Sequence, residues 1–172
     1  KRIMKSKTRV VLPGVLIIAM GALLFSFLNQ GPGLQLVLSD QETSQVLFSL
    51  PVDTGDEVTF HWIHSFEHIP WIEEYSIEAD ETFVLHTISV AGFGAGIPEN
   101  KGVVAIEDGM VVMRSIEERF DEIRWIHSQT ALVSITLGHT TFITGEDVEH
   151  HLPVELSIKG TRTLWPRSLL TK

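Results

Sequence analysis

Residues 57–65 read Glu-Val-Thr-Phe-His-Trp-Ile-His-Ser, and apolar and polar side chains alternate along them. Side chains two positions apart point to the same face of a β-strand, so Val58, Phe60, Trp62 and His64 share one face. Three of these four side chains are large and apolar, which is typical of a strand that covers a hydrophobic core with one face. The stretch therefore predicts a half-buried strand with His64 at its end.

The same alternation continues through most of the chain after residue 33. Runs rich in β-branched and aromatic side chains are separated by turn sequences such as Asp53-Thr54-Gly55-Asp56 and Asp108-Gly109. Many short strands at close spacing predict an all-β fold, an antiparallel barrel or sandwich of about ten strands. Only Ser115–Asp121 has the composition of a helical turn. The expected strands are Leu34–Ser39, Gln45–Leu50, Glu57–Ser65, Ile72–Glu78, Thr82–Ala91, Gly102–Glu107, Met110–Ile116, Ala131–Leu137, Thr140–Ile143 and Val154–Lys159.

Residues 10–28 carry no charge and are almost entirely apolar, and five basic residues precede them. The run is close to the roughly 20 residues that a helix needs to cross a bilayer, and positive flanks stay in the cytoplasm. We therefore expect one N-terminal transmembrane helix acting as a signal anchor. The expected order is a cytoplasmic segment at 1–9, the transmembrane helix at 10–28, a linker at 29–33 and an extracytoplasmic β-domain at 34–172.

A cleaved signal peptide also begins with basic residues and an apolar run. The apolar run here is longer than the usual ~7–15 residues of such signals. The residues that follow it, Phe27-Leu28-Asn29-Gln30, are bulky or carry amides and form no A-x-A pattern. These observations favour retention as an anchor over cleavage.

Composition limits the classes of partner. The first 29 residues hold five of the thirteen Lys and Arg and none of the 22 Asp and Glu, so the expected external domain has a formal charge near −14. Nucleic acids and anionic lipids require basic surface, so neither is an expected partner. The absence of cysteine excludes disulfides, thiolate metal sites and cysteine nucleophiles. An external domain without disulfides fits a bacterial envelope, and we expect the bacterial cytoplasmic membrane as the location.

One tetrapeptide occurs twice, as Trp62-Ile63-His64-Ser65 and as Trp125-Ile126-His127-Ser128. In the second copy Ile123, Trp125 and His127 share one strand face, as Phe60, Trp62 and His64 do in the first. The parity predicts that both imidazoles follow an apolar series and lie near the rim of the interior. Two ordinary strands that share a tetrapeptide by chance explain the repeat equally well.

Residues 61–75, His-Trp-Ile-His-Ser-Phe-Glu-His-Ile-Pro-Trp-Ile-Glu-Glu-Tyr, form the densest polar cluster. His64–His68 formally matches the H-x-x-E-H zinc-peptidase pattern, which needs both histidines on one helical face. Pro70 prevents a helix of useful length, and in an extended chain the two histidines would be roughly 13 Å apart at ~3.3 Å per residue. A metalloprotease is therefore not expected.

No other catalytic constellation stands out. His64 and Ser65 lie on opposite strand faces, and the chain has no G-x-S-x-G nucleophile elbow. We therefore expect no enzyme, no catalytic residues and no cofactor. We assign no metal site, although non-catalytic binding through His61, His68, His150 or His151 stays open.

Residues 92–98, Gly-Phe-Gly-Ala-Gly-Ile-Pro, place three glycines at alternate positions. Such glycines allow backbone amides to approach a ligand or another strand closely, and a nest of amides can hold a carboxylate or phosphate. The segment is no dinucleotide fingerprint, because G-x-G-x-x-G is not matched. A looped crossing between strands is the favoured interpretation over an anion site.

Two segments carry a resemblance to a known family: His64-Ser65-x-Glu67-x-x-Pro70-x-x-Glu73-Glu74-Tyr75 and Phe93-Gly94-Ala95-Gly96-Ile97-Pro98. With them the chain resembles the bacterial domain-of-unknown-function family numbered eighteen-fifty, over Leu34 to about Leu156. Members tend to be encoded beside TAXI-type TRAP transporters, which use an external solute-binding protein to deliver organic anions to a permease. The resemblance implies no established activity.

From the resemblance we expect a membrane-anchored accessory or small subunit of such a transporter, acting as a binding or interaction module. Its partners would be the permease, the solute-binding protein, or both. The alternative is a free-standing envelope protein that binds a small ligand or a metal. The residues expected to form the ligand or interaction surface are His64, Ser65, Glu67, Pro70, Glu73, Glu74, Tyr75, Phe93, Gly94, Gly96 and Pro98.

Overall fold

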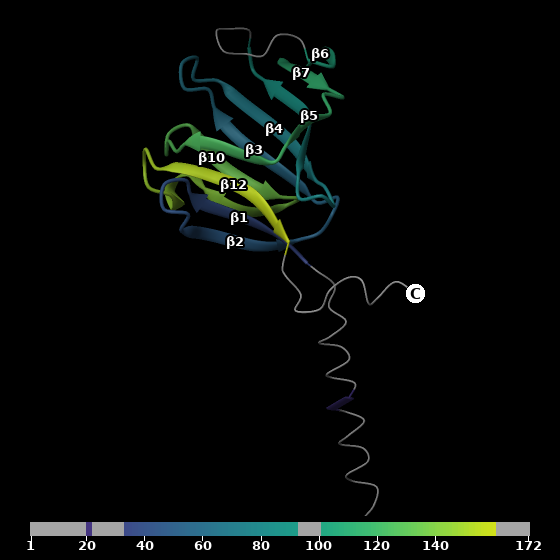
Figure 1. Ribbon diagram of the computed structural model, residues 1–172. Helices are drawn as coiled ribbons and strands as arrows, with labels where there is room; N and C mark the ends of the chain where they lie inside the picture. Colours follow the sequence, from purple (N-terminus) through teal and green to yellow (C-terminus); the bar gives the residue numbers. More distant parts are fainter. Residues whose placement is uncertain (1–19, 22–32, 93–100, 161–172) are drawn as a thin grey trace, which may run out of the picture. The chain divides into compact units, whose positions relative to one another are not determined.

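The computed structural model describes residues 20–21, 33–92 and 101–160 (Figure 1). Among these residues, none belongs to a helix long and apolar enough to cross a membrane. The expected span at 10–28 lies outside the described residues, apart from Met20 and Gly21. All the strands lie in one unit, Gly33–Arg162, and the following description concerns that unit alone.

The described part of this unit is built from antiparallel β-strands and one 3-10 turn, which confirms the predicted all-β class. The alternating runs of the sequence account for most of the strands. The elements are β1 (Leu34–Asp40), β2 (Val46–Val52), β3 (Glu57–Ile63), β4 (Pro70–Ile77), β5 (Phe83–Val90), β6 (Val103–Glu107), β7 (Met110–Arg114), β8 (Glu118–Phe120), β9 (Glu122–Ile126), β10 (Leu132–Leu137), β11 (Thr140–Thr144), η1 (Gly145–Asp147) and β12 (Pro153–Gly160).

The strands form two sheets. One has the order β2-β1-β12-β9, and the other has the order β11-β10-β3-β4-β5-β7-β6, with β8 paired to β5. The first sheet joins segments from the two ends of the domain, since Leu36 of β1 lies opposite Ile158 of β12. Buried residues of both sheets belong to one shared hydrophobic core.

The core fills the space between the sheets. Leu38 of β1 and Leu156 of β12 are completely buried, as are Val58 and Phe60 of β3. The ring of Phe60 also meets Trp125 of β9 edge to face, with centroids 5.8 Å apart. The inward face predicted for β3 is therefore the core face of the large sheet.

The expected helical turn at 115–121 is wrong. Residues Glu118–Phe120 form β8, which pairs antiparallel with Phe83–Leu85 of β5. Ser115 and Glu117 have φ angles of 56° and 54°, so the chain bends between β7 and β8 and then returns to an extended conformation. The edge of β5 thus pairs with β7 over one half and with β8 over the other.

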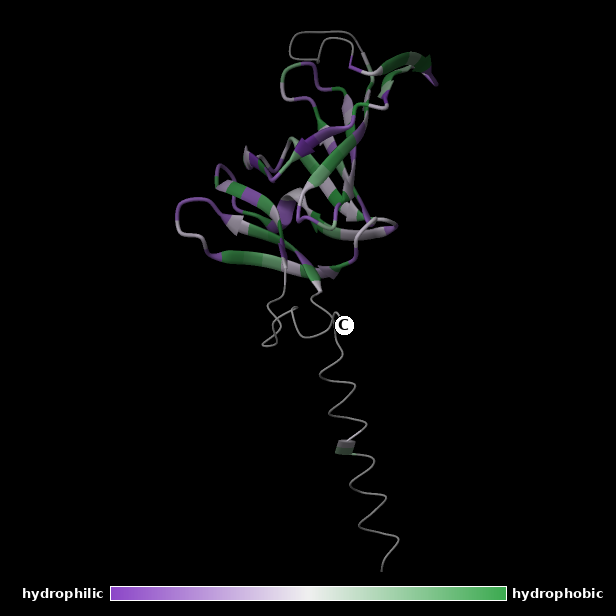
Figure 2. Cartoon of the chain, turned by 45° about the vertical axis from the view of Figure 1, so that its right-hand side comes forward, coloured by the Kyte–Doolittle hydropathy of each residue, from purple (hydrophilic) through white to green (hydrophobic). Residues whose placement is uncertain are grey.

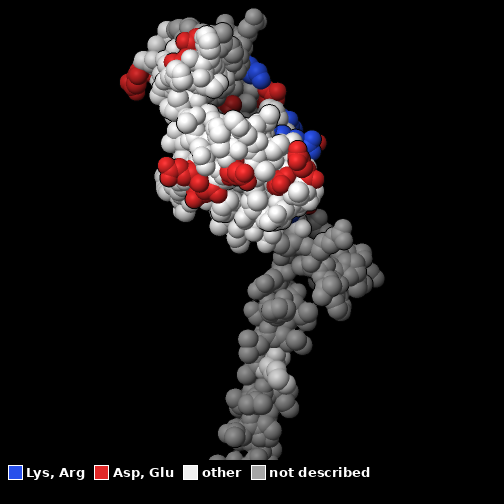
Figure 3. All heavy atoms as spheres, turned by 90° about the vertical axis from the view of Figure 1, so that its left-hand side faces the viewer, with Lys and Arg blue, Asp and Glu red and all other residues white. Residues whose placement is uncertain are grey.

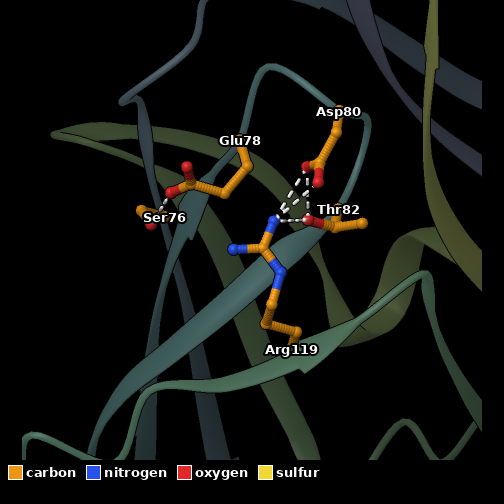
Figure 4. Close-up of polar contacts among 5 residues, drawn as sticks. All are labelled: Ser76, Glu78, Asp80, Thr82 and Arg119. Atoms are coloured by element: carbon orange, nitrogen blue, oxygen red, sulfur yellow. Dashed lines mark hydrogen bonds and ion pairs between the residues drawn. The ribbon is translucent and has the colours of Figure 1, made fainter.

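Polar contacts fasten β8 to the turn between β4 and β5 (Figure 4). The Arg119 guanidinium donates to both carboxylate oxygens of Asp80, at 2.9 and 2.8 Å, and to the hydroxyl of Thr82 at 2.8 Å. Near the start of the same turn, the Ser76 hydroxyl donates to Glu78 at 2.8 Å. The contacts of Arg119 are long-range in sequence, which explains why the local composition of residues 115–121 does not determine their conformation.

The strands β6 and β7 form a hairpin, and the Asp108-Gly109 turn predicted from the sequence connects them. The strand β6 is the last strand of its sheet. In Figure 2 this hairpin is largely coloured as hydrophobic. The side chains of Val103 and Ile106 are 66% and 71% exposed. The domain therefore presents an apolar edge strand to its surroundings.

Candidate functional site

Glu73 stands on the inward face of β4, where its neighbours are aromatic. It lies opposite Phe60 of β3, while Trp71 lies opposite Trp62 in the same register. Tyr75, two positions further along β4, is 5% exposed. A carboxylic acid therefore occupies a face that is otherwise built from large rings.

Three ring donors converge on the Glu73 carboxylate. The indole Nε1 of Trp62 donates to Oε2 at 3.3 Å, and the Tyr75 hydroxyl donates to the same oxygen at 3.2 Å. The indole Nε1 of Trp71 donates to Oε1 at 3.1 Å. Both oxygens thus have partners, which compensates for part of the loss of water around the group.

The pKa values of this cluster are displaced by its burial. Burial raises the pKa of the Glu73 carboxyl, while the hydrogen bonds from Trp62, Tyr75 and Trp71 and the positive charge of Lys101 offset part of the rise. Burial, followed by the charge of Glu73 and the hydrogen bond to it, raises the pKa of the Tyr75 hydroxyl above its ordinary range. The protein thus holds one acidic group where the charged form is costly.

The cluster opens into a cleft with a volume of about 370 Å³. Strands of both sheets form its walls, because Trp125 of β9 closes it opposite β3 and β4. The indoles of Trp62 and Trp125 meet edge to face, with centroids 5.9 Å apart and an angle of 87°. The lining residues are Trp62, Ile63, His64, Ser65, Trp71, Glu73, Tyr75, Ile123, Arg124, Trp125 and Ala131.

His64 directly follows β3 and lines this cleft. Its ring stacks on Trp71, with centroids 5.6 Å apart and an angle of 15°. Its Nδ1 accepts a hydrogen bond from the backbone N–H of Glu67 at 3.1 Å. The imidazole is therefore held as part of the aromatic wall.

The structure gathers four of the expected site residues, His64, Ser65, Glu73 and Tyr75, at one cleft. Others lie elsewhere. Glu74 is exposed and lines a different cavity with His86, because successive side chains point to opposite faces of a strand. Glu67 and Pro70 are exposed, the first in the β3–β4 turn and the second at the start of β4. Phe93, Gly94, Gly96 and Pro98 lie outside the described residues.

The H-x-x-E-H string forms the turn between β3 and β4. The N–H of His68 donates to the carbonyl oxygen of His64 at 2.9 Å, and His68 has a φ of 55°. The chain is therefore a tight turn there and neither a helix nor the extended segment considered from the sequence. Within residues 33–92 and 101–160, no three His, Asp or Glu side chains come together in an arrangement suited to a metal ion.

The two histidines of the repeated tetrapeptide have different surroundings. His127 is completely buried, whereas His64 lines the cleft. The three tryptophans of the cleft were not singled out as site residues from the sequence. Their signal was the alternation Trp71-x-Glu73-x-Tyr75, which places an acid among aromatic side chains on one strand face.

Comparison with known families shows that residues 58–142 match the model of a domain of unknown function, DUF1850. The matched segment is shorter than the Leu34–Leu156 likeness expected from the motifs. Every lining residue of the cleft, from Trp62 to Ala131, falls within it. Neither the curated proteins nor the solved structures give a match.

Proposed function

We propose that this chain is a membrane-tethered binding module that works outside the cytoplasm as an accessory subunit of a TAXI-type TRAP transporter. The charge-free run at 10–28, with basic residues before it, supports the tether. The match to DUF1850 supports the likeness on which the transporter association rests. Organic anions would be carried by the transporter itself, and this module would bind the permease or its solute-binding protein.

The observation that carries this proposal is the apolar strand β6, which is the last strand of its sheet among residues 33–92 and 101–160. An exposed strand edge offers unpaired backbone N–H and C=O groups to a neighbouring strand, and here Val103 and Ile106 add apolar contact area. The side chains of Glu107 and Arg114, on the same hairpin, pair with one another. Such a surface suits a protein partner.

Charge argues against an anionic bilayer as the neighbour of this domain. Acidic side chains are spread over the face drawn in Figure 3, which is turned away from the β6–β7 hairpin, and basic ones are few on that face. Anionic headgroups repel an acidic domain. A membrane protein beside the tether is therefore the favoured neighbour.

Co-purification tests the proposal. The full chain, carrying an affinity tag, is co-expressed with a TAXI-type TRAP permease and its solute-binding protein and extracted in detergent. We expect at least one of them in the eluate, and its loss on Ile106→Lys. Ile126→Lys is the matched control, because Ile126 is 69% exposed and lies on β9, an end strand of the other sheet. If neither transporter protein elutes with the unaltered chain, the proposal fails.

The cleft favours a second candidate, a free-standing envelope protein that binds a small ligand. Its volume of about 370 Å³ and its aromatic lining are within the range of small-molecule sites. A ligand that raises the melting temperature of the chain in the absence of any transporter protein, and no longer does so after His64→Ala, would favour this candidate.

A further inference from the structure

We propose that the cleft binds an organic cation, a quaternary or substituted ammonium group, between its tryptophan rings and the carboxylate of Glu73. This inference deepens the small-ligand candidate and rests on the cleft alone, so it holds whether or not a transporter is the partner.

The first argument is the charge of Glu73. The group is largely buried, and no Lys, Arg or His forms an ion pair with it among residues 33–92 and 101–160. Buried charges in proteins are normally paired. Among these residues the Glu73 carboxylate has hydrogen-bond donors but no neighbouring positive charge in an ion pair, and a ligand cation would supply that charge.

The nearby basic side chains are already engaged. Arg124 lines the cleft, but its guanidinium pairs with Glu122 at 2.7 Å and with Glu155 at 2.9 Å. Lys101, whose charge reaches Glu73, forms its ion pair with Glu118. Arg124 with its two carboxylates carries a net negative charge, and the Lys101–Glu118 pair is neutral, so these groups do not build an anion site.

The second argument is the aromatic lining. Three indoles, one phenol and one imidazole surround the cleft. Cations bind over aromatic faces within about 6 Å of the ring centroid, most strongly on tryptophan, and quaternary ammonium ligands are the usual guests of such sites. The rings are fixed in place, since Trp62 stacks on Phe60 with centroids 5.5 Å apart and Trp71 stacks on His64.

The third argument is that the cleft does not suit an anionic ligand. The indole N–H groups of Trp62 and Trp71, which would be the natural donors to an anionic ligand, are both used by Glu73. A ligand carboxylate in the cleft would find no free donor on these rings and would be repelled by Glu73. The domain as a whole is also strongly acidic, which raises the local concentration of cations.

Calorimetric titration of the full chain in detergent tests the inference, with choline chloride as the probe. The matched ligand is 3,3-dimethylbutan-1-ol, which has the same shape but carries carbon in place of the charged nitrogen. We expect saturable choline binding and at least tenfold weaker binding of the neutral analogue. Equal affinities, stronger binding of sodium acetate than of choline, or no saturable choline binding would overturn the inference.

Variants locate the site. Glu73→Gln retains the size of the side chain, so we expect at least a tenfold loss of choline affinity with little change for the neutral analogue. Glu74→Gln is the matched control, because the adjacent residue is exposed and lines another cavity. Trp125→Leu, on the opposite wall, should weaken choline at least threefold without touching the carboxylate. Full choline affinity in both Glu73→Gln and Trp125→Leu would place any binding elsewhere and refute the proposal.

Discussion

His127 donates from Nε2 to the carbonyl oxygen of Gly145 at 2.8 Å, and neither residue is exposed. The Nδ1 of the same ring accepts a hydrogen bond from the indole of Trp125 at 3.4 Å. Both ring nitrogens of His127 therefore have a hydrogen-bond partner. This histidine joins β9 to the η1 turn and has a structural role.

Replacing His127 should destabilise the protein. His127→Ala leaves the Gly145 carbonyl without its donor and opens a cavity in the core, so we expect a loss of about 2–4 kcal/mol in the free energy of unfolding. Urea denaturation followed by tryptophan fluorescence measures it. His64→Ala, in the other copy of the tetrapeptide, should cost less than about 1 kcal/mol because its ring is only partly buried. Equal losses for the two variants would contradict the structural role of His127.

Gly145 is restricted by space as well as by its hydrogen bond. A Cβ at this position would lie 2.0 Å from the carbonyl oxygen of Leu132, a backbone atom that cannot move without disturbing β10. We therefore expect Gly145→Ala to cost at least about 2 kcal/mol of unfolding free energy. At Gly92 an added Cβ would meet Cδ1 of Ile69 at 3.0 Å, the end of a flexible side chain. Gly92→Ala should therefore be milder, and the reverse order in urea denaturation would contradict this account.

The alternation of side chains predicts most strands, because one buried face leaves a period of two in the sequence. It does not predict which strands pair. The pairing of β1 with β12 joins Leu36 to Ile158, and nothing near either residue in the sequence indicates the other. The strand β8 escaped prediction for a similar reason, since its extended conformation depends on the edge of β5 and on Arg119 reaching Asp80.

The candidate site was predictable in part. The polar cluster at 61–75 contains Glu73 and His64. The prediction also included Glu74, because it follows Glu73 in the sequence, but its side chain lies on the other face of β4. Parity would have separated the two acids, because Trp71, Glu73 and Tyr75 share a face. Trp125 comes from the other sheet, more than fifty positions from Glu73, so its place in the cleft required the three-dimensional fold.

Glu73 should make stability depend on pH. Its pKa is raised in the folded state from a usual value of 4.5, so between these two values the native state binds more protons than the unfolded state. The stability it contributes is therefore complete below about pH 4.5 and is lost as the pH rises through the folded pKa. We expect Glu73→Gln to remove this loss, so that the variant gains stability over the unaltered protein as the pH rises. Denaturation curves of the two proteins between pH 4 and 8 measure the difference, and a difference that stays constant over this range would contradict the expectation.

Tyr75 offers a direct probe of the same cluster, because it is the only tyrosine in the chain. Its pKa is raised by burial and by the charge and hydrogen bond of Glu73, so the folded protein should resist forming the phenolate. For an acid with a raised pKa, stability is lost as the pH rises above the unfolded value of about 10. We therefore expect phenolate absorbance to appear together with alkaline unfolding, seen in parallel by circular dichroism. Glu73→Gln removes two of the causes and should bring the phenolate signal to lower pH. A phenolate signal that develops near pH 10 while the fold is intact would show that Tyr75 is accessible to solvent and does not donate to Glu73.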